Sequence, residues 1–494
     1  MKKLYYVILA VLVPVLASCS GFLDIRTEAS LPVSGMDYTK SENIFQPVSA
    51  AYASLRLDEG EALNYVAVLE IVSDDADKGS SATDGPTVQE LDQFSYTPEN
   101  SNINAVWEFF FEVVSQANYA LESMDKFEKE MSSDADLKLI SECRGEARII
   151  RAYAYFNLVR IFGSVPKIDS SMSASDLNSL SAASVADLYK FIYDDLDAAI
   201  ATVPDAYPDY PGRFTKYTAM ALKTKVALYN RDWNECARLA DEIIASERFD
   251  LVPKYRDVFS MQYENSVESL MELQSSTLGQ TSGDAPLNFY AFIQGPRNNT
   301  PSNMQGWGFK VPSESLVKFL NDRGDTQRYA GTILERGTTT PEGDEIKDNC
   351  ENPYYNAKVY TPSRYNNWSY NGYGFDYNMR IIRYAEILLM YAEALANNAP
   401  VGAKSGLSAD DALGKVRDRA GLPATTATLE NIYDERRAEL ALEENRFFDL
   451  VRWGKAAEVL GPLGFTAGKN EVFPVPSAQR QVNPNLPTTP GYTY

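Results

Sequence analysis

Four aspartates between positions 74 and 84 are residues whose type and spacing suggest chemistry. Carboxylates at alternate positions can bind Ca²⁺, but an EF-hand loop needs glycine at its sixth place and glutamate at its twelfth. Counted from Asp75, those places hold Ser80 and Pro86, so the stretch does not match and we predict no metal site. Asp74, Asp75 and Asp77 are candidate acceptors for ligand hydroxyl groups, with solvated or helix-capping side chains as the alternative.

The chain contains no histidine, and this limits the reactions open to it. Ser-His-Asp and Cys-His nucleophiles need an imidazole base near neutral pH, and imidazole is the commonest ligand of transition metals. An enzyme would have to use carboxylates, lysine or tyrosine, as a glycoside hydrolase does with two carboxylates roughly 5–10 Å apart. No acidic pair stands out from the many others, so we predict no catalytic residue and no cofactor.

Aromatic residues are concentrated in irregular sequence between about positions 251 and 378. Sugars present apolar ring faces and hydroxyl edges, so a binding protein needs exposed rings with amide, carboxylate or guanidinium groups beside them. Two clusters, at 288–307 and 354–377, have this composition. The alternative is that their rings only seal the loops against a scaffold. The predicted ligand-binding rings are, in order of preference, Trp307 and Trp368, then Tyr290 and Tyr370.

The amino terminus has the pattern of a bacterial lipoprotein signal. Two lysines precede an apolar run from Leu4 to Leu16, and Leu16-Ala17-Ser18-Cys19 looks like a lipobox. We expect residues 1–18 to be a signal peptide, Cys19 to carry the lipid, including palmitate, and residues 19–42 to form the anchor and tether. The run is shorter than the ~20 residues of a spanning helix, so lipid chains alone would hold the protein at the membrane. An ordinary cleaved signal is the alternative.

Charge and cysteine content restrict the partners. The formal net charge of −22 repels phosphate backbones, so we predict no nucleic-acid partner. Besides Cys19, the chain has Cys143 and Cys236 in helical sequence and Cys350 in a loop. At most one disulfide can form among these three, and the absence of a CxxC motif leaves a zinc site unsupported.

Most of the remaining sequence has helical periodicity. Helices are expected at 43–57, 104–129, 143–162 and 184–203, the last with Ser184 as its N-cap. Residues 218–230 and 232–246 form a hairpin typical of a tetratricopeptide unit, and 380–396 with 409–420 form a later copy. Because such hairpins bury their apolar faces only by stacking, we predict an all-α, tetratricopeptide-like scaffold.

Two regions interrupt this scaffold. Residues 71–98 read as a long polar loop, and 251–378 as an irregular, ligand-facing excursion whose one good helix is 313–321. The body at 43–494 would then be a single unit with its scaffold at 43–250 and 379–460.

The stretch from Tyr433 to Trp453 combines dense charge with a helical apolar stripe and ends in large rings. Opposite charges three or four residues apart stabilise an exposed helix by only ~0.2–0.5 kcal/mol per pair. So many charges in one segment suggest that they are held against neighbouring elements.

This stretch, preceded by RIIRYAEILLMYAEALA and followed by VFPVPSAQRQVNPNL, resembles the SusD/RagB family of outer-membrane lipoproteins. RGEARIIRAYAYFNLVRIFGSVPKI, AVWEFFFEVVSQANYALE and the lipobox fit the same pattern, so the resemblance covers nearly the whole mature chain. One departure is Glu444-Asn445, where a Gly-His type of dipeptide is expected.

The resemblance implies a cell-surface lipoprotein of the outer membrane that captures glycans and closes a TonB-dependent transporter barrel of the SusC type, without catalysis. Peptide capture by the same family is an alternative, and loop aromatics favour sugar over peptide. A carboxylate-based glycoside hydrolase and a pure repeat scaffold are further alternatives, and the scaffold leaves the aromatic excursion unexplained.

Overall fold

The computed structural model describes residues 35–57, 59–275, 289–299, 306–365 and 377–494. The α-helices in this part of the chain are α2 Gln46–Ala53, α3 Glu59–Val66, α4 Pro86–Asp92, α5 Ser101–Glu130, α6 Asp134–Phe162, α7 Ala174–Leu177, α8 Val185–Thr202, α9 Lys216–Tyr229, α10 Trp233–Ala245, α11 Glu314–Asp322, α12 Thr326–Thr332, α13 Tyr384–Ala396, α14 Ala409–Arg419, α15 Leu429–Leu440, α16 Arg446–Arg452, α17 Ala456–Leu460 and α18 Ser477–Val482. The strands are β1 Ala76–Gly79, β2 Ser269–Leu273, β3 Phe309–Pro312, β4 Ile333–Glu335, β5 Thr338–Thr339, β6 Glu345–Ile346, β7 Tyr354–Asn356 and β8 Met379–Arg383.

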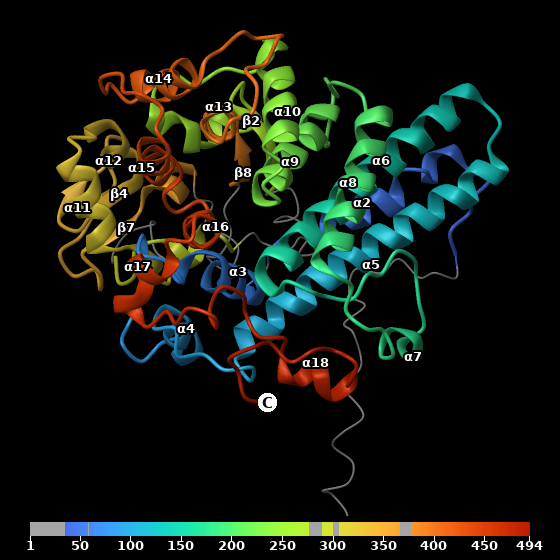
Figure 1. Cartoon of the computed structure of the whole chain (residues 1–494), viewed down its shortest axis with the longest axis horizontal. Helices are drawn as coiled ribbons and strands as arrows, with labels where there is room; N and C mark the ends of the chain where they lie inside the picture. Colours follow the sequence, from blue (N-terminus) through green and yellow to red (C-terminus); the bar gives the residue numbers. More distant parts are fainter. Residues whose placement is uncertain (1–34, 58, 276–288, 300–305, 366–376) are drawn as a thin grey trace, which may run out of the picture.

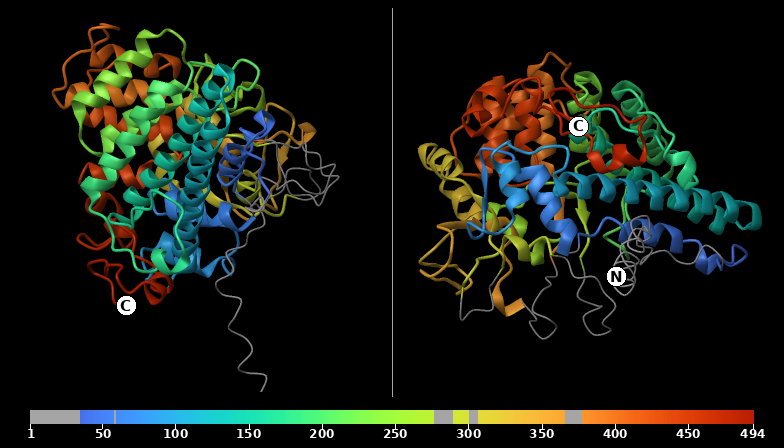
Figure 2. Two further views of the ribbon diagram at one scale, coloured as in Figure 1. Left: turned by 90° about the vertical axis from the view of Figure 1, so that its right-hand side faces the viewer. Right: turned by 90° about the horizontal axis from the view of Figure 1, so that it is seen from below.

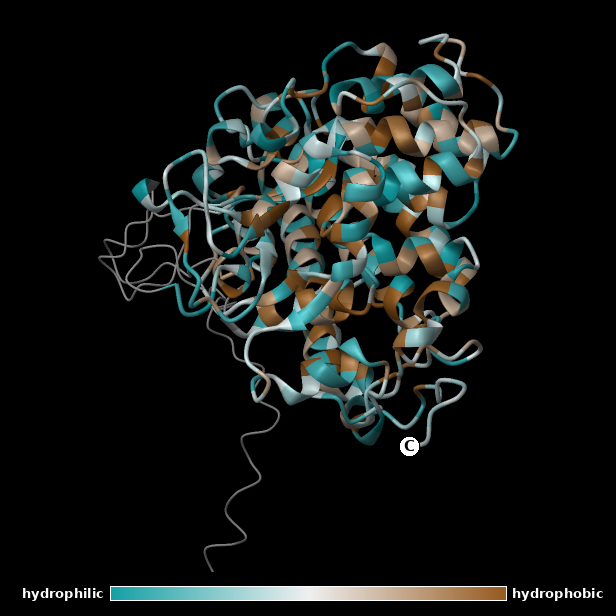
Figure 3. Ribbon diagram, turned by 90° about the vertical axis from the view of Figure 1, so that its left-hand side faces the viewer, coloured by the Kyte–Doolittle hydropathy of each residue, from teal (hydrophilic) through white to brown (hydrophobic). Residues whose placement is uncertain are grey.

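The helices stack into a continuous array (Figure 1). The long α5 and α6 lie side by side, α8 packs on α6, and α9, α10 and α13 follow in order, with α14 and α15 against α13. Hydrophobic and hydrophilic residues alternate along these ribbons, as expected for helices that bury one face (Figure 3). The predicted all-α scaffold of stacked helical pairs is confirmed. None of the helices in the described residues is both long and apolar enough to cross a bilayer.

Local sequence sets the helix ends as predicted in several places. Ser184 caps α8, and its hydroxyl accepts a hydrogen bond from the Asp187 backbone N–H at 3.1 Å. Asp232 caps α10 in the same way, which confirms the predicted turn between α9 and α10. Gly163, with a φ of 72°, ends α6.

Several predictions of elements were wrong in part. The helix expected from Arg380 begins only at Tyr384, because Met379–Arg383 pairs with β2 as strand β8. The segment 71–98, expected to be a loop, contains β1 and α4. Helix α12 was not predicted.

The strands of the described residues form four antiparallel pairs: β1–β3, β2–β8, β4–β7 and β5–β6. In the first pair Ala76 lies opposite Pro312 and Gly79 opposite Phe309. In the segment between α10 and α13, the elements α11, α12, β4 and β7 lie beside α15 at one side of the molecule, while α5 and α6 extend away on the other side (Figures 1 and 2). The pairing of β1 with β3 joins the N-terminal part of the scaffold to this segment.

Charged side chains of α15 are buried against neighbouring elements. Arg328 of α12 and Arg383 of β8 lie within 3.0 Å of Glu439, and Arg436 lies 3.4 Å from Glu386 of α13. These residues are at most 1% exposed. The prediction that the charges of the 433–453 stretch are held against neighbouring elements is confirmed.

The rings at the two ends of that stretch also meet, since Tyr433 stacks on Trp453 with 3.9 Å between centroids. Elsewhere Cys143, Cys236 and Cys350 are buried free thiols, so they form no disulfide with one another.

Candidate functional site

A hollow of about 380 Å³ lies where β1, α4, β3 and the start of β7 meet. We call it the acidic hollow. Its lining consists of residues 77–80 of β1 and the turn after it, Ala82, Gln89 and Asp92 of α4, residues 311–312 of β3, Glu314 of α11, and residues 352–354. The lining combines carboxylates, amides, a hydroxyl and the ring of Tyr354, and this mixture suits a polar ligand with apolar faces.

The backbone of the acidic hollow depends on a close approach between two glycines. Gly79 has a φ of 67°, and a Cβ there would lie 2.3 Å from the carbonyl oxygen of Gly308. The Ser80 N–H donates to that same oxygen at 2.5 Å. Only glycine permits this approach, which brings the end of β1 onto the start of β3.

Two arginines hold the segment that leads into β1. Arg446 contacts both oxygens of Asp74 at 2.7 and 2.9 Å, and Arg437 contacts Asp75 Oδ1 at 2.7 Å. Asp75 is 0% exposed and Asp74 is 9% exposed. Because the carboxylates of Asp74 and Asp75 are buried in internal ion pairs, the prediction that they accept hydrogen bonds from ligand hydroxyls was wrong. They position β1 instead.

Lys310 anchors the opposite strand, β3. Its ammonium is buried and donates to Glu444 Oε1 at 2.5 Å, to the Leu442 carbonyl at 3.0 Å and to the Tyr290 hydroxyl at 3.2 Å. Tyr290 is 4% exposed and donates its own O–H to Glu444 at 2.6 Å. Tyr290 is therefore an interior residue, and its prediction as a ligand-binding ring was wrong.

Acidic side chains dominate the charge of the hollow. Asp77 and Glu314 are exposed at its wall, and Asp92 accepts a hydrogen bond from Gln89 Nε2 at 3.0 Å. Burial, followed by the neighbouring charge of Asp77, raises the pKa of Asp92 to about 6. Partial desolvation by the surrounding walls of the hollow, followed by the nearby charge of Glu314, likewise raises the pKa of Asp77. Of the three predicted aspartates, Asp77 alone lines the hollow.

Trp307 lies next to Gly308, close to the acidic hollow but not in its lining. Its half-buried indole packs on Phe292 with 5.8 Å between ring centroids. Part of the indole therefore seals the loop against its neighbours, which was the alternative to ligand binding, while the rest is open to solvent. Cys19, Trp368 and Tyr370 lie outside the described residues.

Sequence reasoning missed several residues of the hollow. Asp92, Glu314 and Asn352 are far apart in the chain and form no motif. They meet because β3 pairs with β1, α4 contacts β1, and β7 contacts β3. Tyr354 belonged to an aromatic cluster that the composition did identify. The amide Nδ2 of Asn352 is buried and has no hydrogen-bond partner in the described part of the chain.

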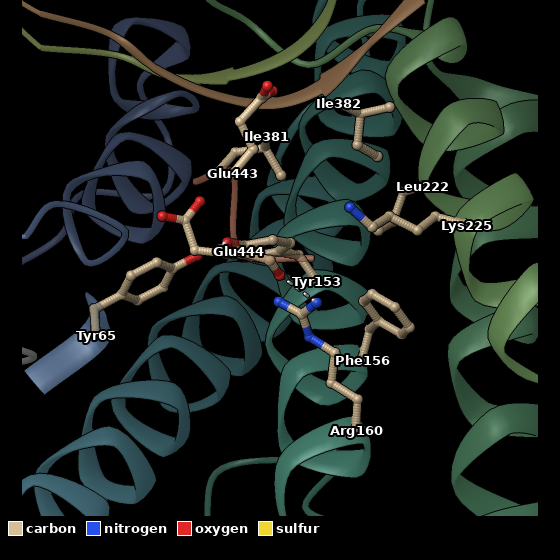
Figure 4. A pocket seen from close by; sticks show the side chains of 10 residues that line it. All are labelled: Tyr65, Tyr153, Phe156, Arg160, Leu222, Lys225, Ile381, Ile382, Glu443 and Glu444. Carbon is tan, nitrogen blue, oxygen red and sulfur yellow. Dashed lines mark hydrogen bonds between the residues drawn. The ribbon is translucent and has the colours of Figure 1, made fainter. Parts of the chain in front are cut away.

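A second cavity lies inside the scaffold and has a different character (Figure 4). It is lined by side chains including Tyr65, Tyr153, Arg160, Lys225 and Glu444, and its volume is about 20 Å³. That volume holds about one water molecule, so it is too small for a nutrient ligand. The acidic hollow is the better candidate.

Comparison with known proteins agrees with this fold. A profile described as the SusD family matches residues 267–464, and one described as "Starch-binding associating with outer membrane" matches residues 22–228. A SusD-like protein P2 from Formosa agariphila is 27% identical over the whole of both chains. A SusD-like protein from Bacteroides ovatus is 26% identical over 88% of this chain and 80% of its own.

Solved structures give the same result. A laminarin binding SusD-like protein superposes with a TM-score of 0.78 and 28% identity over 92% of this chain and 99% of its own. Surface glycan-binding protein A from Bacteroides fluxus, at 24% identity and a TM-score of 0.77, shares the fold over 92% of this chain and 100% of its own. The two profiles together match most of the sequence and the fold agrees along it, so this chain belongs to the SusD family.

Proposed function

We propose that this protein is a cell-surface lipoprotein that captures oligosaccharides in the acidic hollow and delivers them to a TonB-dependent transporter barrel of the SusC type. The observation that carries the proposal is the hollow itself. It places the ring of Tyr354 beside the carboxylates of Asp77 and Glu314 and the amide of Asn352. Carboxylates and amides pair with sugar hydroxyls, and an aromatic face packs on the CH groups of a pyranose ring.

Its relatives support the ligand class. The laminarin binding SusD-like protein is named for a glycan, and at 28% identity it aligns with almost all of the chain. A volume of about 380 Å³ falls within the ~300–1,000 Å³ of small-molecule sites. Capture requires binding alone, so the protein would act without catalysis.

Attachment and delivery extend this proposal. The lipobox ending at Cys19 would anchor the protein, and one of the matching profiles describes association with the outer membrane. Several acyl chains hold a protein at a bilayer far more durably than one. A barrel that receives the ligand is the partner that the family implies.

The test is calorimetric titration of the purified mature protein with a panel of neutral oligosaccharides that includes laminarihexaose. We expect one member to bind with a Kd of about 1 μM to 1 mM, and Tyr354→Ala to weaken it by about three- to tenfold, the loss expected for one ring contact. Trp307→Ala combined with Trp368→Ala tests the two predicted tryptophans.

Tyr210→Ala is the matched control, because Tyr210 is 65% exposed and lies outside the hollow. Binding that survives unchanged in Tyr354→Ala would remove the hollow as the site. If the protein bound peptides and none of the glycans, the result would favour peptide capture, the alternative function. Release of shortened products from the panel would contradict a purely binding role.

A further inference from the structure

The charges around the acidic hollow bear on which glycans can enter it. Asp77, Asp92 and Glu314 line it from three different elements, β1, α4 and α11. Burial is the larger cause of the raised pKa of Asp92 and of that of Asp77. A neighbouring acid adds to each shift, Asp77 to that of Asp92 and Glu314 to that of Asp77. Like charges raise one another's pKa only where they share one electrostatic environment. With three carboxylates against the single ammonium of Lys78, the described lining of the hollow carries a net negative charge.

The basic side chains nearby are already engaged. Lys78, the one cationic residue of the described lining, is 4% exposed and donates to the carbonyl oxygens of Ser81 and Asp84, each at 2.9 Å. Arg297 lies 2.8 Å from the carboxylate of Asp84. The Lys78 ammonium is therefore buried and paired, and the Arg297 guanidinium lies outside the lining of the hollow and pairs with Asp84.

Within the described residues, no group of three or more acidic or cysteine side chains is arranged to hold a metal ion. The carboxylates are thus left as hydrogen-bond acceptors, and hydroxyl groups are the donors that a neutral sugar brings. A ligand carboxylate or sulfate would bring no donor and would meet like charge.

We propose that the acidic hollow selects uncharged glycans and excludes glycans that carry carboxylate or sulfate groups, with Asp77 and Glu314 as the residues that enforce the exclusion. This inference rests on the proposed function, because it names the substrate class of the same site. It separates neutral polysaccharides from uronic-acid-containing and sulfated ones as ligands of this protein.

The test compares each neutral polysaccharide of a panel, laminarin included, with the same polymer after oxidation of its primary hydroxyls to carboxylates. Affinity gel electrophoresis of the mature protein measures both forms. We expect the oxidised form to bind at least about tenfold more weakly than the neutral form at low salt. This gap in affinity should narrow as added salt screens the carboxylates. In Asp77→Asn/Glu314→Gln most of this difference in affinity between the neutral and the oxidised polysaccharide should disappear.

Glu130→Gln/Asp209→Asn is the matched control, since both residues are exposed, lie outside the hollow and carry the same total charge. It should leave the gap unchanged. Equal binding of neutral and oxidised forms by the unaltered protein would overturn the exclusion while the proposed function stands. A gap that persists in Asp77→Asn/Glu314→Gln would also overturn it, because the loss would then come from the missing hydroxyls. Failure to bind any polysaccharide in either form would overturn the proposed function, and this inference with it.

Discussion

Lys310 and Glu444 lie 134 residues apart, yet their side chains meet in the interior with 2.5 Å between Nζ and Oε1. Both residues also hold a left-handed backbone, with φ of 53° and 58°. Glu444 occupies the place where the family resemblance leads one to expect a glycine, a residue that adopts such a φ without strain. In this chain, the ion pair with Lys310 accompanies that strained conformation.

Lys310→Met should destabilise the protein by about 3–5 kcal/mol, because it leaves the buried Glu444 carboxylate without its cation. Urea unfolding measures the loss. Lys318→Met is the control, since Lys318 forms an ion pair with Asp322 on the surface and its loss should cost under about 1 kcal/mol. Equal losses of unfolding free energy in the two variants would show that the buried ion pair stabilises the protein no more than the surface pair does.

Glu444→Gly should also destabilise the protein, although it relieves the backbone at a φ of 58°. Relief of one left-handed residue contributes roughly 1–2 kcal/mol, which is less than the cost of leaving Lys310 buried without its carboxylate. The double variant Lys310→Met/Glu444→Gly should be more stable than Glu444→Gly alone. Unfolding curves that rank the two in the opposite order would contradict this coupling.

Glu439 makes stability fall in acid. Burial alone would raise its pKa, but Arg419, Arg328 and Arg383 lower it below the ordinary 4.5. A lowered pKa in the folded state means that the stabilisation is complete above pH 4.5 and is lost as pH falls further. Glu439→Gln should therefore lower Tm strongly at pH 7, and the difference from the unaltered protein should shrink at pH 3. Thermal scans at both pH values check this, and a constant difference would refute it.

Asp92 should have the opposite pH dependence. Its folded pKa of about 6 lies above the ordinary 3.8, so the folded state favours the protonated form, and ionisation lowers stability as pH rises from about 4 through 6. Asp92→Asn should raise Tm at pH 7.5 and leave it nearly unchanged at pH 3.5. The exposed Asp209→Asn serves as control in the same scans. A Tm gain that does not depend on pH would show that repacking, and not charge, is responsible.

Cys19→Ala should release the protein from membranes. With the acyl attachment point gone, no described helix provides a bilayer span, so the protein should move from the membrane fraction to the soluble fraction. Fractionation of cells fed with labelled palmitate measures location and acylation together. Label retained by Cys19→Ala would place the lipid elsewhere.

The scaffold could be predicted because its signals are local. The apolar spacing of α9 and α10, and the caps Ser184 and Asp232, lie within a few residues of what they determine. The segment from Arg380 was predicted to be helical because its apolar spacing is helical. It forms strand β8 because it pairs with β2, a partner more than 100 residues away that local spacing cannot reveal.

The site was less predictable, because it too depends on partners that are distant in the sequence. Asp74, Asp75 and Asp77 look alike in sequence, and only the positions of Arg437 and Arg446 decide that two of them turn inward. Asp77 remains exposed on β1, where it lines the hollow together with Glu314. Partners contributed by distant segments cannot be inferred from the spacing of the acids themselves.

The anchoring of both walls of the acidic hollow on residues 437–446 has a consequence for biosynthesis. The segment leading into β1 is held by Arg437 and Arg446, and β3 is held by Glu444. A ribosome makes these residues after most of the helical array, so the earlier helices can stack while the hollow is still unformed. A nascent chain stalled before residue 437 would carry much of the scaffold and no binding site.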